Sequence, residues 1–426
     1  MTMPILEGGL DFDSPIMVKV HQHFDSTRID QTEIRQILRD RICDPAIKRM
    51  IRPDMNIALA VGSRGIRHLD FIVRTVVDIL REMGAKPFIV PSMGSHGGAT
   101  PEGQKGVLRH YGITEETMGI PIEASMETLE LGVVDDVPVY ISRPAYESDL
   151  IIPICRVKPH TDFKGRVESG IYKMLAIGLG KHKGAATIHK AGFPAFATLI
   201  PKIGQFIADH APVGFAVSII ENSYDEVESV HIVPKERIAT EEPKLLMRAK
   251  QLLAKINIDP IDLLIVDQIG KDISGEGMDP NVTGRSPAGV AFEDVPQIKR
   301  IAVLDLTKET HGNASGIGMA DVTTRRCFEK IDLQVTYANV ITAGVFDSCK
   351  IPMILENDKE LLAVGLKAAT LTPPDQARVV RIQDTLHLSE FWVSANIAES
   401  LKHDPRFTIT NERRPFTFDE NGNLTW

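Results

Sequence analysis

Short, continuous apolar runs separated by amphipathic stretches dominate the first part of the chain. The runs 56–62, 87–91 and 150–154 have the length and composition of parallel strands that are buried on both faces. Between the first two, residues 69–83 place apolar side chains at the spacing of one helical face, and Gly84 follows as a helix-ending residue. This alternation of strand and helix predicts an α/β fold.

A second α/β segment follows a polar helix that we expect at residues 241–254. The runs 262–267 and 301–306 predict two further strands beyond it. We therefore predict two α/β domains with mainly parallel sheets and an active site in the cleft between them. The N-terminal domain spans residues 1–257, and the second domain, which closes the cleft, spans residues 258–390.

Chemically distinctive side chains follow each of the first three predicted strands. Arg64 comes after the first strand, His96 after the second in a glycine-rich loop (GSHGG), and His160 after the third. In open α/β sheets, ligands bind beyond the carboxyl ends of the strands, and histidine suits proton transfer near neutral pH. The pattern places one cation and two imidazoles on the same rim. The glycine-rich loop could equally cradle a phosphate through the main chain of Gly97 and Gly98.

The segment from Lys158 to Lys190 concentrates further reactive groups. It reads KPHTDFKGRVESGIYKMLAIGLGKHKGAATIHK, with Lys173 among apolar neighbours and His189 sixteen residues later. A lysine in apolar surroundings can have a lowered pKa and form covalent adducts. Lys181 begins a basic cluster (KHK) that either holds a phosphate or forms a solvated turn.

Together these residues resemble the nickel-dependent lactate racemase family, whose members carry the nickel-pincer nucleotide. The matching pieces span most of the chain and occur in family order. They are Gly62-Ser63-Arg64, the segment 94–100, Pro159-His160, Lys173, His189 and the segment 278–281.

The resemblance implies a role for each matching residue. His96 and His160 correspond to the two acid/base histidines of the family. Lys173 corresponds to the lysine that binds the cofactor covalently through a thioamide, and His189 to the histidine that ligates nickel. Arg64 corresponds to the arginine that holds the substrate carboxylate. The implied protein is an isomerase, a racemase or C2-epimerase of a 2-hydroxy acid. Its expected partners are this small molecule and the proteins that build the cofactor.

The implied chemistry is physically reasonable. Removing the Cα proton of a 2-hydroxy acid is difficult, because the adjacent carboxylate stabilises a carbanion poorly. Removing hydride instead gives a planar 2-keto acid that can be reduced from either face. This route needs a cofactor that holds the hydride and two bases on opposite sides of the substrate. Besides Lys173, we expect Gly97, Gly98 and Lys181 to contact the cofactor.

Two departures from the lactate enzymes bear on the substrate. The segment between His160 and Lys173 is longer and lacks a Gly-Gly pair before the lysine, and Arg285 stands nearest to the polar residues expected after Asn281. Polar side chains in the second-domain loop would be left unpaired over a methyl group, which is costly in a closed site. We therefore predict a substrate larger or more polar than lactate. It is either a sugar acid, which suits Asn281, or a dicarboxylate, which requires Arg285.

The end of the chain carries three further predictions. Residues 321–330 predict a helix, and residues 416–426 predict a hairpin around Asn421-Gly422. Residues 391–426 form a separate segment that, in the resembled family, returns to the first domain.

Composition narrows the function classes. A net charge of −9 over 426 residues argues against a nucleic-acid binder. No run of about 18 apolar residues occurs, so no membrane span is expected. The four cysteines have neither CxxC nor zinc spacing, which fits a reducing cytoplasm.

Two other function classes stay open at the level of sequence. One is a non-catalytic ligand-binding or regulatory protein on the same scaffold, and the other is a phosphate-binding hydrolase that uses the glycine-rich loops. The joint presence of Lys173 and His189 favours the racemase, since a scaffold protein needs neither. The sequence contains no serine nucleophile elbow and no P-loop, which weakens the hydrolase.

Overall fold

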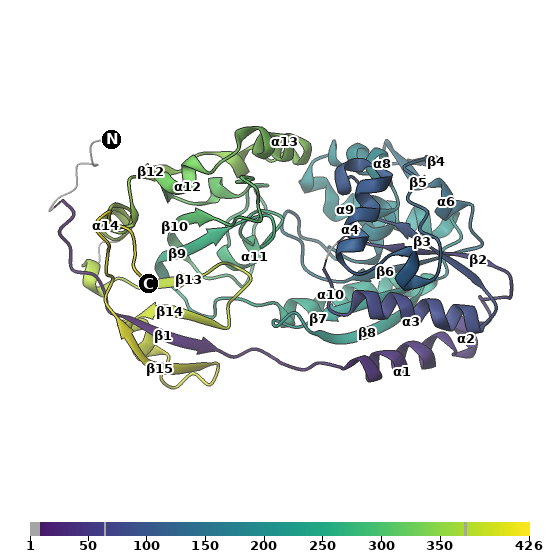
Figure 1. The fold of residues 1–426 in the computed structure, drawn as a ribbon, viewed down its shortest axis with the longest axis horizontal. Helices are drawn as coiled ribbons and strands as arrows, with labels where there is room; N and C mark the ends of the chain where they lie inside the picture. Colours follow the sequence, from purple (N-terminus) through teal and green to yellow (C-terminus); the bar gives the residue numbers. More distant parts are fainter. Residues whose placement is uncertain (1–8, 64, 370–372) are drawn as a thin grey trace. The chain divides into compact units, whose positions relative to one another are not determined.

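The chain folds into two compact units in a computed structural model that describes residues 9–63, 65–369 and 373–426 (Figure 1). The central unit comprises Asp25–Leu253, and the terminal unit comprises Met1–Phe24 together with Ala254–Trp426. Each unit contains a sheet with mostly parallel strands and helices between them, which confirms the predicted α/β class.

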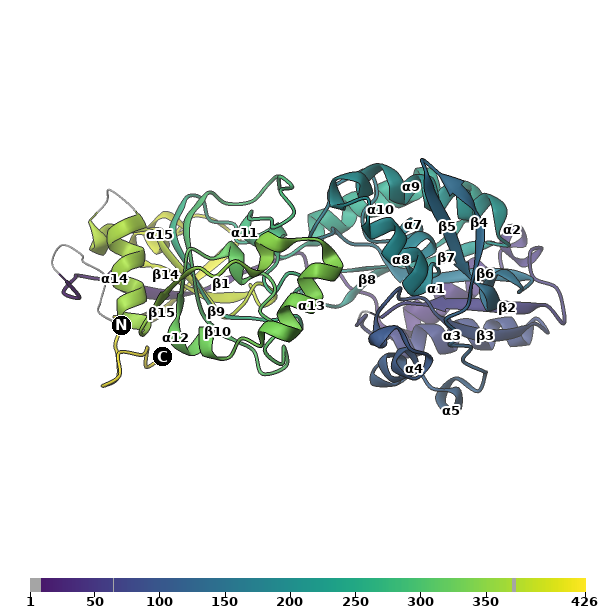
Figure 2. The same cartoon turned by 90° about the horizontal axis from the view of Figure 1, so that it is seen from above.

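The central unit is built on a five-stranded sheet in the order β3-β2-β6-β7-β8 (Figure 2). The first four strands are parallel, and β8 runs antiparallel to β7. A separate antiparallel ribbon joins β4 and β5. The strands are β2 Asn56–Val61, β3 Lys86–Pro91, β4 Thr128–Val134, β5 Val137–Ser142, β6 Leu150–Arg156, β7 Phe215–Glu221 and β8 Val227–Pro234.

The middle strands of this sheet are apolar throughout because both of their faces are covered. In β2 and β6 almost every residue is buried, whichever face it points to. On one face, Leu38 and Val76 pack with Leu59 in a single core.

The helices of the central unit are α1 Gln31–Ile42, α2 Pro45–Lys48, α3 Leu69–Glu82, α4 Pro101–His110, α5 Glu115–Met118, α6 Arg143–Tyr146, α7 Ile171–Lys173, α8 Lys181–His189, α9 Phe193–His210 and α10 Ile238–Leu252, with short turns η1 Gly97–Ala99, η2 Met174–Gly178 and η3 Lys235–Arg237.

The terminal unit has an eight-stranded sheet in the order β12-β11-β10-β9-β13-β14-β1-β15. The strands from β12 to β13 are parallel, and β14, β1 and β15 are antiparallel. The strands are β1 Met17–Gln22, β9 Ile261–Ile269, β10 Ile298–Leu306, β11 Val322–Thr324, β12 Met353–Leu355, β13 Val379–Ile382, β14 Glu390–Ser394 and β15 Phe407–Arg414. The helices are α11 Pro280–Thr283, α12 Arg325–Glu329, α13 Leu333–Ala343, α14 Asp358–Ala369 and α15 Ala395–Ser400, with short turns η4 Ile317–Met319, η5 Phe346–Cys349 and η6 Pro374–Gln376.

The two ends of the chain depart from the predicted division. The boundary after Leu253 lies close to the predicted one, but residues 1–24 belong with the C-terminal half. Residues 391–426 lie in the terminal unit, where β14 and β15 flank β1, a strand that the prediction assigns to the first domain. The reversal around Asn421-Gly422 is present, with Phe418 bridged to Leu424 and Gly422 at a φ of 80°.

The helix predicted at residues 321–330 is half wrong. Residues 322–324 form the strand β11, and the helix α12 begins only at Arg325. The three strand residues are β-branched and pair in parallel with both β10 and β12. Sheet pairing therefore overrides the helical pattern in the first half of this segment.

Candidate active site

The parallel strands of the central unit bring three sequence-distant loops to one edge of the sheet. β3 lies on one side of β2 and β6 on the other, so the chain reverses its winding direction beside β2. Such a switch point opens a crevice beyond the carboxyl ends of the strands. Ser63, His96 and His160 all lie in the loops that leave this edge. Arg64, the predicted carboxylate-binding residue, lies outside the described residues.

His160 lies in direct contact with Lys173. Nζ of Lys173 is 2.6 Å from Nε2 of His160, and both side chains are partly buried. The main-chain N–H of Asp162 donates to Nδ1 of the same ring at 3.0 Å. Because Nδ1 is held by the loop itself, Nε2 is the nitrogen that faces Lys173. The structure thus brings together two residues that the sequence assigned to the base and to the cofactor.

The loop that carries His160 is closed and anchored by a buried carboxylate. Lys158 and Ser169 exchange two main-chain hydrogen bonds across the base of the loop. The main-chain N–H of His160 donates to Oε2 of Glu168 at 2.7 Å, and Lys250 lies 2.7 Å from the other oxygen. The Glu168 side chain has no solvent exposure. This charge-assisted contact fixes the main chain at His160.

Lys173 lies at the junction of α7 and the π-turn η2, a type of helix irregularity that is common at functional sites. The buried carboxyl of Glu242, from α10, accepts the main-chain N–H of Tyr172 at 3.1 Å. Burial raises the pKa of this carboxyl to about 8, against the opposing effect of the N–H groups of Tyr172 and Ile171. Glu242 therefore caps the turn that presents Lys173.

His189 ends α8 and sits against aromatic rings. Its ring centroid is 5.1 Å from that of Phe196 and 5.5 Å from that of Phe193. Phe193 also lies 6.2 Å from the ring of His160, so the two histidines share one aromatic wall. Burial, and secondarily the charge of Lys173, lower the pKa of His189 to about 4. The imidazole is therefore neutral at pH 7, which is the form that ligates metals.

His96 is oriented by a hydroxyl from the neighbouring loop. Oγ of Ser63 lies 2.5 Å from Nδ1 of His96, and the hydroxyl of Tyr111 donates to the carbonyl of Ser63 at 3.1 Å. The His96 side chain is exposed. Next to it, a Cβ built at Gly62 would lie 3.1 Å from the Met174 side chain. The Ser63–His96 pair therefore lies beside the turn that carries Lys173.

The two glycines after His96 have different surroundings. Both have left-handed φ values, 66° for Gly97 and 64° for Gly98. A Cβ at Gly97 would lie 2.5 Å from the main chain of Gly103, so this glycine is required by its close approach to α4. A Cβ at Gly98 would meet nothing within 4 Å. Gly98 is thus the position where a ligand can approach the main chain.

Lys181 does not lie where a phosphate ligand must lie. Its side chain is completely buried, and its ammonium donates to the carbonyl of Pro91 at 2.6 Å and to Oε1 of Gln104 at 3.1 Å. The prediction that Lys181 contacts the cofactor is therefore wrong, because protein atoms enclose its charge.

Asn281 and Arg285 belong to the terminal unit. The side chain of Asn281 donates to Oδ1 of Asp279 at 2.8 Å, within the first turn of α11. The guanidinium of Arg285 lies 2.6 Å from a carboxylate oxygen of Asp321 and donates to the carbonyls of Met319 and Lys299. These contacts tie Arg285 into its own unit and weigh against a role as a second carboxylate-binding cation.

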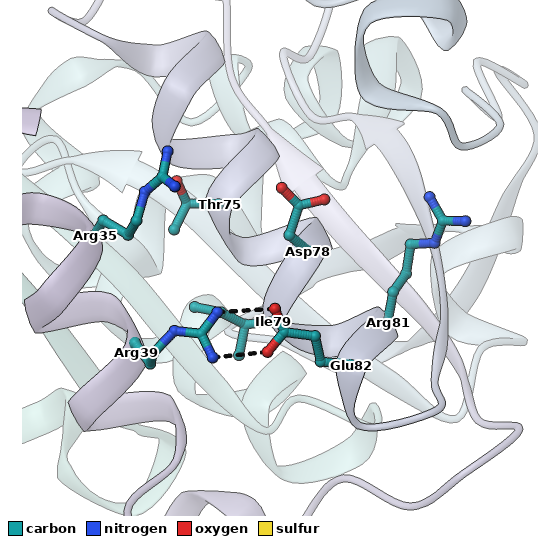
Figure 3. Close-up of a pocket in the computed structure, with 7 residues that line it drawn as sticks. All are labelled: Arg35, Arg39, Thr75, Asp78, Ile79, Arg81 and Glu82. Carbon is teal, nitrogen blue, oxygen red and sulfur yellow. Dashed lines mark hydrogen bonds and ion pairs between the residues drawn. The ribbon is translucent and has the colours of Figure 1, made fainter. Parts of the chain in front are cut away.

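A surface pocket of about 430 Å³ between α1 and α3 is unrelated to these residues (Figure 3). It is lined by the second half of α3, which starts at the carboxyl edge of the sheet and runs back to the opposite edge. Its most prominent cation, Arg39, is already bound by both carboxylate oxygens of Glu82 at 2.7 and 2.8 Å. We therefore place the candidate site at the strand ends.

The described ranges contain neither a cluster of metal ligands nor a helix that could span a membrane. Within residues 9–63, 65–369 and 373–426, no group of three or more His, Cys, Asp or Glu is arranged to hold a metal ion. None of the helices in these ranges is long and apolar enough to cross a membrane.

Sequence reasoning missed the residues that hold the site in shape. Ser63 belongs to the segment Gly62-Ser63-Arg64, and its position at the end of a strand next to that of the His96 loop is a usable signal. Glu168 and Glu242 were not singled out. A glutamate eight residues after His160 gives a weak signal, whereas Glu242 gives none, because its contact with Tyr172 spans 70 positions.

Comparison with known proteins gives the family and the fold. The chain belongs to the family described as Domain of unknown function (DUF362), whose model matches residues 55–289, more than half of the chain. No curated protein matches the sequence.

Two solved structures share the fold. One is the lactate racemase apoprotein from Thermoanaerobacterium thermosaccharolyticum, with a TM-score of 0.55 and 12% identity, covering 91% of this chain and 96% of that one. The other is a crystal structure of a protein from Thermotoga maritima, with a TM-score of 0.50 and 13% identity, covering 86% of this chain and 99% of that one. The fold is thus that of lactate racemase.

Proposed function

We propose that the protein is an isomerase that racemises or epimerises a 2-hydroxy acid at C2, using a nickel-pincer nucleotide bound to Lys173. The observation that carries the proposal is the grouping of Lys173, His160 and His189 around one aromatic wall in the central unit. The likeness of the fold to lactate racemase supports it.

The residues present fit such a cofactor. Lys173 offers a primary amine at a helical turn, and His189 offers a neutral imidazole from the end of the next helix. Nickel accepts imidazole as a ligand. The main chain at Gly98 is open to a ligand. When bound, the cofactor supplies the hydride acceptor and donor, which no amino-acid side chain can supply.

The chain's own residues move the proton. His160 and His96 come from loops after different strands, as a pair of bases for two enantiomers requires. Ser63 holds Nδ1 of His96, and the Asp162 N–H holds Nδ1 of His160. In His96, Nε2 is the nitrogen left for a reacting hydroxyl. In the neutral ring of His160, Nδ1 accepts the Asp162 N–H, so Nε2 carries the ring proton and would donate it first, as the acid of the pair.

The contacts of Arg285 narrow the proposed substrate. A dicarboxylate needs a second cation, and the best candidate for it is already engaged by Asp321. We therefore propose a substrate with neutral hydroxyl groups, such as a sugar acid, ahead of a dicarboxylate. The partners of the protein would be the proteins that build the cofactor.

The test is to produce the protein together with a cofactor-building system and measure its intact mass and nickel content. The loaded protein is then assayed on enantiopure lactate, malate and C2-epimeric sugar acids. A mass adduct with nickel and a highest kcat/KM for a sugar acid is the expected result. Loaded protein that turns over none of these acids would contradict the proposal. Absence of both adduct and nickel would favour a ligand-binding scaffold instead.

A further inference from the structure

A buried lysine occupies the start of α8. Lys181 has no solvent exposure, and among the described residues no carboxylate forms an ion pair with it. Its main chain is left-handed, with a φ of 54°. The positive end of a helix dipole lies at the same place. Each of these features costs free energy, and burial lowers the pKa of the ammonium to about 8.

Gln104, which accepts a hydrogen bond from this lysine, also contacts the loop that carries His96. Gln104, on α4, is also completely buried and accepts from Lys181 through Oε1 at 3.1 Å. Its amide nitrogen donates to the carbonyl of Gly94 at 3.0 Å and to that of His96 at 3.4 Å. The amide of Gln104 therefore links Lys181, which its oxygen contacts, to the His96 loop, which its nitrogen contacts.

Two further hydrogen bonds hold the loop that carries His96, one at its start and one to the turn after Lys173. Lys181 also donates to Pro91, the last residue of β3, from which the loop departs. The main-chain N–H of Gly94 donates to the carbonyl of Gly178, at 3.3 Å, in the turn that follows Lys173. Hydrogen bonds therefore hold the loop at three places: Pro91, Gly94 and His96.

We infer that Lys181 and Gln104 are positioning residues that fix the His96 loop relative to the turn that carries Lys173. An apolar side chain of similar volume would leave the carbonyl of Pro91 and Oε1 of Gln104 without this donor, so the lysine is tied to these two acceptors by its directed hydrogen bonds. The inference deepens the proposed function, on which the role of His96 rests. The hydrogen-bond geometry itself does not depend on that role.

Gln104→Glu is the sharpest test, because it changes one side of the amide only. The carboxylate keeps an acceptor for Lys181 and adds an ion pair, but it replaces the N–H donor with an oxygen that repels the carbonyls of Gly94 and His96. Lys181→Met removes the ammonium from the other end. Lys183→Met, an exposed lysine two residues away, is the matched control. Gln104→Asn keeps the amide with a shorter reach and serves if the buried glutamate prevents folding.

The first readout uses the full chain without cofactor, by NMR of the histidine ring nitrogens. Gln104→Glu (or Gln104→Asn) and Lys181→Met should shift the His96 signals and weaken the Ser63 contact to Nδ1, whereas Lys183→Met should not. In loaded enzyme, kcat/KM should fall about 10²-fold with a near-normal Tm, the scale of a 1 Å misplacement. Unchanged His96 signals in the Gln104 and Lys181 variants would overturn the inference. If the loaded enzyme proves inactive on every acid, the NMR comparison still decides it.

Discussion

Nζ of Lys173 lies 2.6 Å from Nε2 of His160, so the amine proposed to bind the cofactor contacts the ring nitrogen proposed to exchange a proton with the substrate. Acylation would turn the Lys173 amine into an uncharged amide-type nitrogen with a single N–H. An amide-type nitrogen cannot accept a hydrogen bond, so acylation would end any hydrogen bond that the Nε2–H of His160 donates to Lys173. If the proposed function holds, cofactor attachment would therefore change the hydrogen bonding of the proposed acid/base residue.

Replacing Lys173 with alanine should abolish both the mass adduct and the bound nickel. His189 alone is a single ligand, which does not retain a metal without the organic part of the cofactor. Intact-mass spectrometry and elemental analysis check this. Lys190→Ala, an exposed lysine just beyond α8, should load normally. A Lys173→Ala protein with full nickel and activity would show that the assignment is wrong.

His96→Ala and His160→Ala should each lower racemisation by about 10²-fold or more, the usual loss for a positioned acid or base. In the proposed mechanism each histidine serves one enantiomer, so neither single variant could complete the cycle. Isotope exchange starting from each enantiomer should show which half of the reaction is lost. Near-normal turnover in either variant removes that histidine from the mechanism. Nickel content should stay at the wild-type level in both, because neither residue is the proposed metal ligand.

The sequence predicts the strands of the central sheet and the loops at their ends that carry the candidate residues. It does not predict the contacts that hold these loops in place. β2, β3 and β6 are apolar because both faces are covered, and this leaves a plain pattern in the sequence. The loops after them follow from the rule that parallel carboxyl ends share an edge.

Lys181 shows where such reasoning ends. In the sequence it belongs to a basic cluster that looks solvated or phosphate-binding, yet the fold buries it completely while its neighbours His182 and Lys183 stay exposed. Only the folded chain, in which the Lys181 ammonium meets Pro91 at the end of β3 and Gln104 on α4, decides which of the three points inward. Likewise, the pairing of residues 17–22 with β14 and β15 spans nearly the whole chain, so no local pattern indicates it.

Glu242→Gln should remove a pH dependence of stability between pH 5 and 8. Burial raises the pKa of the Glu242 carboxyl in the folded protein to about 8, from an ordinary value of 4.5, so between these pH values the unfolded chain has lost a proton that the folded protein keeps. Stability therefore falls as pH rises through this window, by up to about 1.4 kcal/mol per pH unit. The glutamine variant cannot ionise and should lack this slope. Urea unfolding at several pH values measures it.

The matched control is Glu241→Gln, at the adjacent position of α10. Hydrogen bonds from Arg237 and Lys244 lower the pKa of Glu241, so it is ionised in both states above pH 5. Its replacement should leave the slope unchanged. An equal slope in wild type and in Glu242→Gln would mean that Glu242 is ionised in the folded protein.

Gly103→Ala and Gly106→Ala, one turn apart in α4, should have opposite effects. A Cβ at Gly103 would lie 1.8 Å from the carbonyl oxygen of Gly97, so the His96 loop must move away. A Cβ at Gly106 meets nothing within 4 Å. Overpacking should destabilise Gly103→Ala by about 1–3 kcal/mol, while Gly106→Ala should gain about 0.5–1 kcal/mol from helix propensity. Thermal unfolding measures both.

Because the segment displaced in Gly103→Ala carries His96, turnover should fall in this variant even at a temperature where the protein remains folded, and it should be unchanged in Gly106→Ala. Equal turnover in the two variants would show that the contact between α4 and the loop does not set the position of His96.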